Sequence, residues 1–478
     1  MIPEETNTFN ISGGASQIAP NATTQQQIFC SEEFAKTILG CKEKPITVVV
    51  LGAGVDATLG FPTSANLIPC IVDFLETEEG KLIDSTLRKA IGSVRFHFDK
   101  FVSNAIDRLA KDLDKELVAI CRNIREELEH NTSLSDDHRK LGSLIFRLFR
   151  KIIDIKTGAT IDAETESLIE EVFDTVVKDD TIIDFNRLNY TDTFKNIIIE
   201  ILQKSMHENE NPILRHVYKN ILDIEQLLSQ YFYGFYTGRV SYVRDYLYIS
   251  WILWAYLVSE EQRQMQQESA EAEEVRQPNI YAQLKDKECQ LVTFNYTSYA
   301  RQNSRTALYF HGSLMEYVDV ENKNDFLLDD LANINLAEFF KDKLAAEISF
   351  DADRKSIPIP SFLPPLKLQS IISKRYIDTW YHTSQLMFRA NRIVILGCSF
   401  TVADSYFCDI LRENLDAQIV IIDKDMETVS RHVCDILQLP INRYSRQIVN
   451  GKEQRKYNNR VTIVGADLAE VNLDEYLK

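Results

Sequence analysis

Three short segments of this chain carry residue types that could bind a nucleotide and act on it. They are Leu51–Thr63, which contains three glycines, Thr293-Phe-Asn-Tyr296, and Phe310-His-Gly-Ser313. Each segment directly follows a hydrophobic run that is typical of a buried β-strand. Because the carboxyl ends of parallel strands meet at one edge of a sheet, the pattern predicts a nucleotide pocket at that edge.

The glycine segment has two interpretations. Glycines at a strand end let backbone N–H groups face a pyrophosphate with no side chain in the way. However, Gly52-Ala-Gly54 followed by Gly60 lacks the spacing of the G-x-G-x-x-G fingerprint of dehydrogenases. Taken alone, it fits a tight structural turn as well as a phosphate site.

The predicted elements that position these segments belong to an α/β fold. Hydrophobic runs rich in β-branched residues predict six strands, at 46–51, 290–294, 306–310, 392–396, 418–423 and 460–464. Apolar residues recur every three or four positions between the first two strands, which indicates helices. The prediction is a Rossmann-like parallel six-stranded sheet with a large all-helical insertion after the first βα unit.

The same patterns predict the domain boundaries. We expect a flexible N-terminal arm at 1–28, a sheet domain formed by 29–71 and 285–478, and a helical insertion at 72–284. Within the insertion, the apolar stretch 246–258 is too short to span a bilayer and predicts a buried core helix. The polar stretch 259–277 predicts an exposed helix end or loop.

Composition excludes several classes of function. Asp and Glu outnumber Lys and Arg by 71 to 53, and the net charge of −18 disfavours direct nucleic-acid binding. The eight cysteines are dispersed without metal-ligand spacing, so we expect reduced thiols, no metal site and a cytoplasmic protein. No export signal and no membrane association are expected.

A family resemblance rests on four motifs in order: Gly52-Ala-Gly54 with Gly60-x-Pro62, Thr293-x-Asn295, His311-Gly312, and Gly397-x-Ser399 with Asp404 following. In this order the chain resembles the sirtuins, and in particular the sirtuin-like NAD-hydrolysing effectors of bacterial antiphage defence, as in the Thoeris system. The resemblance covers the sheet domain, about 220 residues, and not the helical insertion. It implies that the sheet domain is a sirtuin-like Rossmann NAD-binding domain.

The resemblance implies cleavage of the bond between nicotinamide and ribose in NAD, through an oxocarbenium-like ribose. Asn295 matches the asparagine that orients ribose and water. His311 matches the histidine that accepts a proton from a ribose hydroxyl. The alternatives are a turn or cap asparagine and a hydrogen-bonded histidine at a strand end.

The resemblance also implies a set of NAD-contacting residues: Gly52, Ala53, Gly54, Asp56, Thr58, Pro62, Thr63, Thr293, Gly397, Ser399, Phe400 and Asp423. For Ser399 the alternative is a helix N-cap, and for Asp423 it is a cap of the helix that begins near Met426. A carboxylate at position 56 would repel phosphates unless it points away to cap its helix.

The chain departs from the protein-deacylating sirtuins in three ways. It has Thr63 and Thr297 where those enzymes carry aspartates, and it lacks their four-cysteine zinc module. The resemblance therefore favours hydrolysis of NAD, with a deacylase, an ADP-ribosyltransferase or an inactive nucleotide-binding scaffold as alternatives. It further implies a gated enzyme that assembles as a homo-oligomer or with an operon-encoded partner such as an ATPase.

Overall fold

A computed structural model of the chain describes residues 45–62, 67–102, 104, 113–131, 134–156, 191, 224–237, 239–270, 279–328, 330–362, 374–400 and 404–477. The chain divides into two units, Met1–Ile46 and Thr47–Lys478, and every described element belongs to the second. The predicted flexible arm and Thr63 lie outside the described residues.

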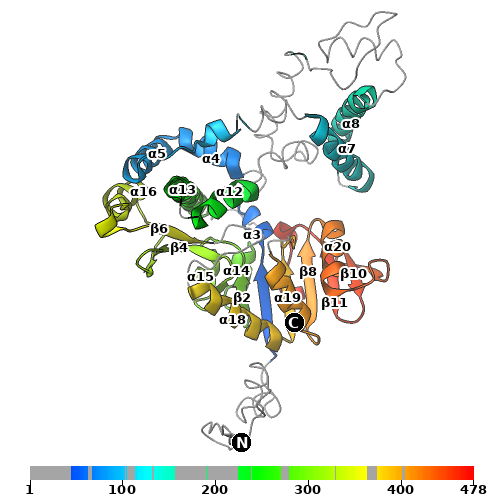
Figure 1. The fold of residues 1–478 in the computed structure, drawn as a ribbon. Coiled ribbons are helices and arrows are strands. Elements are labelled where there is room, and N and C mark those ends of the chain that lie inside the picture. The colour runs from blue at the N-terminus through cyan, green and yellow to red at the C-terminus, as the bar shows by residue number, and fades with distance from the viewer. Residues whose placement is uncertain are drawn as a thin grey trace, which may run out of the picture. The chain divides into compact units, whose positions relative to one another are not determined.

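The main sheet has eight strands in the order β3-β2-β1-β7-β8-β11-β10-β9. Figure 1 labels four of them, β2, β8, β11 and β10. All six predicted runs lie in it and pair in parallel, as β3 (Leu308–Tyr309), β2 (Gln290–Thr293), β1 (Thr47–Leu51), β7 (Arg392–Leu396), β8 (Gln418–Asp423) and β11 (Val461–Gly465). Two antiparallel strands extend the edge, β10 (Lys452–Tyr457) and β9 (Ser445–Val449). The predicted count of six strands is therefore wrong.

The edge hairpin escaped prediction because its strands are polar rather than hydrophobic. Its turn is Asn450-Gly451, with φ of +51° and +77°, and this residue pair favours two-residue hairpins. By contrast, Val48 to Leu51 in the centre of the sheet are fully buried, which explains why a continuous β-branched run formed there.

Helices cover the main sheet. One face shares a hydrophobic core with α14 (Ile280–Leu284) and α15 (Tyr299–Asn303). In addition, α18 (Lys374–Arg389) contacts β3, α20 (Met426–Leu437) contacts β8 and β11, and α19 (Ser405–Glu413) contacts both helices. A five-residue helix, α3 (Ala53–Ala57), follows β1 directly.

The segment predicted to be helical contributes α4 (Leu67–Glu76), α5 (Glu78–Ile91), α7 (Leu113–His130), α8 (Asp136–Lys156), α12 (Ile224–Tyr236) and α13 (Val240–Ala270). The predicted core helix 246–258 is confirmed, because every residue in it is buried within α13. The polar stretch after it continues α13 to Ala270, and Glu261 and Gln264 are buried. The expectation of an exposed end is wrong at these two positions.

A second, three-stranded antiparallel sheet was not predicted. It consists of β4 (Gly312–Asp319), β5 (Asn324–Leu327) and β6 (Pro358–Phe362) in the order β5-β4-β6. The indole N–H groups of Trp251 and Trp254 on α13 donate to the carbonyls of Pro358 and Leu314, each over 2.8 Å. The helical region is thus completed by strands from later in the chain.

Short helical turns complete the fold, at Leu336–Glu338 (α16), Phe339–Leu344, Ala345–Glu347 (α17), Ala352–Arg354, Leu468–Glu470 and Leu473–Glu475. Within the described residues, no helix combines the length and apolar character that crossing a membrane requires.

Candidate active site at the carboxyl edge of the sheet

The predicted site segments begin at one level of the main sheet. Strand pairing aligns one residue from each of five parallel strands in a row: Tyr309, Thr293, Leu51, Leu396 and Ile422. The residues that follow this row are Phe310, Phe294, Gly52, Gly397 and Asp423. Four motifs from distant parts of the chain therefore meet at the carboxyl edge, together with Asp423.

The glycine turn after β1 packs against the turn after β7. A Cβ atom on Gly52 would lie 2.3 Å from the Gly397 carbonyl oxygen, and one on Gly54 would lie 2.8 Å from the Gly397 Cα. Gly397 itself has a φ of +60°, which favours glycine. Close backbone packing at the point where β1 lies between β2 and β7 therefore explains these three glycines.

The backbone N–H groups of both glycines are used within this packing, which fits the interpretation as a tight structural turn. The N–H of Gly52 donates to the Leu396 carbonyl over 2.8 Å, and the N–H of Gly54 donates to the Gly397 carbonyl over 2.9 Å. Ala53, which lies between them, is exposed.

The Asn295 side chain is buried against the glycine turn, with 6% of its surface exposed. Its Nδ2 donates to the Gly52 carbonyl over 3.0 Å, to Asp56 Oδ1 over 2.8 Å and to the Tyr281 hydroxyl over 3.2 Å. Its backbone N–H donates to Thr293 Oγ1 over 3.0 Å. Because the acceptors surround Nδ2, they fix which way the amide points.

Asp56 is the centre of this network. It lies inside α3 rather than at its N-cap, so it does not cap the helix, and its side chain points into the protein. It accepts hydrogen bonds from Asn295, from Tyr281 and, over 2.9 Å, from Thr297. Burial raises the pKa of Asp56 to about 6, and these three hydrogen bonds oppose that rise.

Tyr281 and Thr297 are contributors that the sequence analysis did not place in the site. Tyr281 comes from α14, a helix whose sequence carries no motif, and its ring stacks on Tyr299 with centroids 5.3 Å apart. Thr297 appeared only as a departure from the deacylating sirtuins. In the structure its hydroxyl donates to Asp56.

His311 lies on the neighbouring strand end in an aromatic setting. Its ring centroid is 5.0 Å from that of Phe294 and 5.2 Å from that of Phe310. Its Nε2 is 3.2 Å from Asp404 Oδ1, and both side chains are buried. The sequence analysis named Asp404 only as following the fourth motif, and the fold shows its pairing with His311.

The loops that carry Asn295 and His311 are joined by backbone hydrogen bonds. The N–H of Phe310 donates to the Thr293 carbonyl, and the N–H of Leu314 donates to the Tyr296 carbonyl, each over 2.9 Å. The two candidate catalytic residues therefore lie between two fixed points on adjacent chain segments.

The remaining predicted contacts lie around this edge. Ser399 is exposed, and its carbonyl accepts a hydrogen bond of 2.7 Å from His432 Nδ1. Phe400 is buried with a φ of +52°. The Thr58 hydroxyl donates to the Val55 carbonyl at the end of α3, and Pro62 is half-buried.

Asp423 ends β8, and burial raises the pKa of its carboxyl group. Its Oδ1 accepts the N–H of Asp425 over 2.8 Å. The N-cap of α20 is Asp425, whose side chain accepts the N–H of Thr428. Asp423 is therefore not the cap, and the ribose role remains a prediction. The cap of α19 is Asp404 rather than Ser399.

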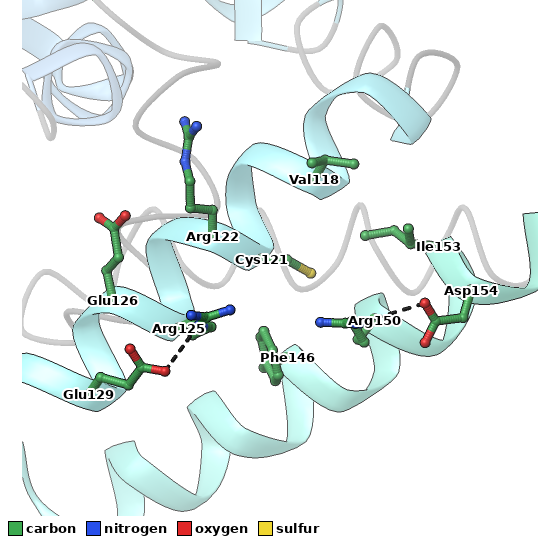
Figure 2. A pocket seen from close by; sticks show the side chains of 10 residues that line it. All are labelled: Val118, Cys121, Arg122, Arg125, Glu126, Glu129, Phe146, Arg150, Ile153 and Asp154. Carbon is green, nitrogen blue, oxygen red and sulfur yellow. Dashed lines mark hydrogen bonds and ion pairs between the residues drawn. The ribbon is translucent and has the colours of Figure 1, made fainter. Parts of the chain in front are cut away.

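A cavity of about 620 Å³ lies elsewhere, between α7 and α8 (Figure 2). Its lining includes the apolar side chains of Val118, Phe146 and Ile153. Two of its arginines, Arg125 and Arg150, pair with Glu129 and Asp154. It shares no residue with the sheet edge, so we place the candidate site by residue chemistry rather than by cavity size.

No family model and no curated protein matches the chain. Solved structures that match include "The Structural basis for Sirtuin Substrate affinity", at 16% identity and a TM-score of 0.22, over 38% of this chain and 78% of the other. Another, "Sir2 bound to acetylated peptide", has 16% identity and a TM-score of 0.23 over 38% and 80%.

A third match is the Sir2 structure in complex with the inhibitor EX-527, 2'-O-acetyl-ADP-ribose and deacetylated p53 peptide, at 16% identity and a TM-score of 0.22 over 38% and 81%. The structural neighbours are thus Sir2 structures. Superpositions this partial carry no argument about chemistry, which rests instead on the residues described above.

Proposed function

We propose that the chain is a sirtuin-like NAD glycohydrolase that releases nicotinamide and ADP-ribose. One observation carries the proposal: Asn295 and His311 follow adjacent parallel strands at the level of the Gly52 turn. An amide and an imidazole that meet at this edge can hold a ribose between them.

The chemistry follows from the atoms available. Breaking the bond between nicotinamide and ribose leaves positive charge on the ribose, and water then adds to the anomeric carbon and loses a proton. Asn295 uses Nδ2 for its protein contacts, so its Oδ1 is directed to accept a hydrogen bond from ribose or water. His311 accepts a proton from a ribose hydroxyl, the hydroxyl regains a proton from the added water, and Asp404 stabilises the resulting imidazolium.

The closed state of the site supports gating. Asn295 and His311 expose only 6% and 4% of their surfaces, so a dinucleotide enters only after the edge opens. In the proposal, an activator opens the site, NAD is depleted, and the enzyme serves as a cytoplasmic effector of antiphage defence. Assembly into a homo-oligomer or with an operon-encoded ATPase belongs to the same proposal.

The test is release of nicotinamide from NAD by the purified full-length chain, alone and with the product of the neighbouring gene. We expect release that Asn295→Ala and His311→Ala each abolish. Undiminished turnover in both variants would exclude the assignment. Faster transfer of an acyl group from an acyl-lysine peptide than hydrolysis of NAD would redirect it to a deacylase.

A further inference from the structure

Helix α13 contributes residues to two hydrophobic cores of the described structure. It has 31 residues, which at 1.5 Å per residue gives a length of about 46 Å. Its residues up to Val258, among them Trp251 and Trp254, pack into the core shared with the three-stranded sheet. Met265, in its second half, packs against the core on one face of the main sheet.

Between these regions α13 presents a fully buried carboxyl group, that of Glu261. Both of its oxygens accept the backbone N–H of Ser298, over 3.1 and 3.2 Å, and Oε1 also accepts the Ser298 hydroxyl. A buried carboxyl group is costly unless it is hydrogen-bonded, so its presence here indicates a role that an apolar residue would not fill. Burial raises the pKa of Glu261 to about 7.

Ser298, which Glu261 binds, is three positions from Asn295 and directly follows Thr297. Thr297 donates to Asp56 Oδ2, and Asn295 donates to Asp56 Oδ1. A displacement of Ser298 therefore moves the Thr297 hydroxyl, which donates a hydrogen bond to Asp56. The Asp56 carboxyl group in turn orients the Asn295 amide. The other side of this loop is held by the Tyr309 hydroxyl, which donates to the Thr297 carbonyl over 2.9 Å.

Gln264 lies three residues after Glu261 on the same side of α13 and contacts the glycine segment. A Cβ on Gly60 would lie 2.7 Å from Gln264 Nε2. Gly60 has a φ of +93°, so the chain turns sharply at this contact. One face of α13 thus contacts both the Asn295 loop and the glycine segment.

We propose that Glu261 is a positioning residue through which helix α13 sets the orientation of Asn295 and thereby couples the helical region to the candidate active site. This inference rests on the proposed function of Asn295. Movement of α13 then changes turnover without any contact between the helix and NAD. The helical region acts on the site through one carboxyl group and one loop.

The experiment compares Glu261→Gln and Ser298→Ala with a matched control, Gln262→Ala. Gln262 is the next residue of α13, and its Nε2 donates to the carbonyls of Leu331 and Ile334, away from the sheet edge. We expect Glu261→Gln to lower kcat for nicotinamide release at least about tenfold with KM nearly unchanged, because a misplaced catalytic group loses rate rather than affinity. Ser298→Ala shifts kcat in the same direction, and Gln262→Ala does not.

A second measurement is independent of turnover. In hydrogen exchange of the full-length chain, Glu261→Gln speeds exchange of the amides at 295–299 relative to wild type, whereas Gln262→Ala leaves them unchanged. Equal exchange and equal kcat in the Glu261 and Gln262 variants would overturn the inference. A wild-type protein without nicotinamide release under activation would refute the proposed function, while faster exchange in Glu261→Gln would still establish the contact between helix and loop.

Discussion

The two halves of the candidate site are built differently. Asn295 lies in a network of polar groups drawn from α3, α14 and the sheet edge, with two buried carboxyl groups, those of Asp56 and Glu261, within reach of its loop. His311 lies among aromatic rings and pairs with one carboxylate, that of Asp404. The orientation of the amide therefore depends on many hydrogen bonds, and that of the imidazole on packing and one partner.

The largest effect tests whether both halves act on one substrate. We expect Asn295→Ala and His311→Ala each to reduce nicotinamide release by a factor of about 100 to 10,000, the range typical of lost acid–base or orienting groups. Initial-rate assays with NAD measure this. Loss of activity in only one of the two variants would show that the unaffected residue, Asn295 or His311, has no catalytic role.

The next effect concerns the single partner of the imidazole. We expect Asp404→Asn to lower kcat about 10- to 1,000-fold, because an amide keeps the shape of the carboxylate but cannot stabilise an imidazolium. Steady-state assays with NAD at several concentrations give kcat. A variant with the wild-type kcat would show that Asp404 has no part in the proton transfer.

A third effect concerns the glycine turn shared by both halves. Gly397→Ala should destabilise the chain by about 2–4 kcal/mol, because its Cβ would lie 2.7 Å from Gly54 Cα at a positive φ. Gly451→Ala is the matched control, since Gly451 has a φ of +77° but open space around it. Its expected cost is about 1 kcal/mol. Urea unfolding measures both, and equal losses would refute the packing explanation.

The smallest effect is a pH dependence that belongs to the Asn295 half. The pKa values of Asp56 and Glu261 in the folded chain, about 6 and about 7, exceed the ordinary values of 3.8 and 4.5. The folded state therefore binds these protons more tightly than the unfolded state, and the stabilisation present below about pH 4 is lost as pH rises to about 7.

Glu261→Gln isolates the contribution of one of these groups. Between pH 4.5 and 7, wild type should lose up to about 3 kcal/mol of stability relative to this variant, at about 1.4 kcal/mol per pH unit. Urea unfolding of both proteins at several pH values gives the difference. A constant difference would mean that Glu261 is already ionised in the folded chain.

Local sequence was sufficient for much of the fold. The central strands β1, β7 and β8 were predicted because each is a largely buried run rich in β-branched residues, and such runs tolerate few other structures. The polar hairpin of β9 and β10 and the sheet that begins at Gly312 were missed. Strands β9 and β10 form the edge of the main sheet, and β4 and β6 pack against α13, which is distant in sequence. The residues of these strands therefore lack the continuous β-branched pattern.

For the site, the sequence indicated which residues reach the sheet edge but not what each contacts. Asn295 and His311 were identified from motifs, and strand register places both at that edge. Tyr281 and Glu261 were missed, because their neighbours in sequence are ordinary helix residues. Gly52, Gly54 and Gly397 were identified from the motifs, but the structure requires glycine at these positions mainly because two backbones pack closely there.

By itself, the sequence determined the strands, the motifs and the order in which they follow one another, since these depend on hydrophobic patterning and on residue type. Only the tertiary structure decided that the Asp56 carboxyl group faces Asn295, that Asp404 pairs with His311 and that a polar stretch of α13 is buried at Glu261. The reason is physical. A hydrogen bond between residues dozens or hundreds of positions apart leaves no local pattern in the sequence. Its strength depends on how completely the surrounding fold excludes water.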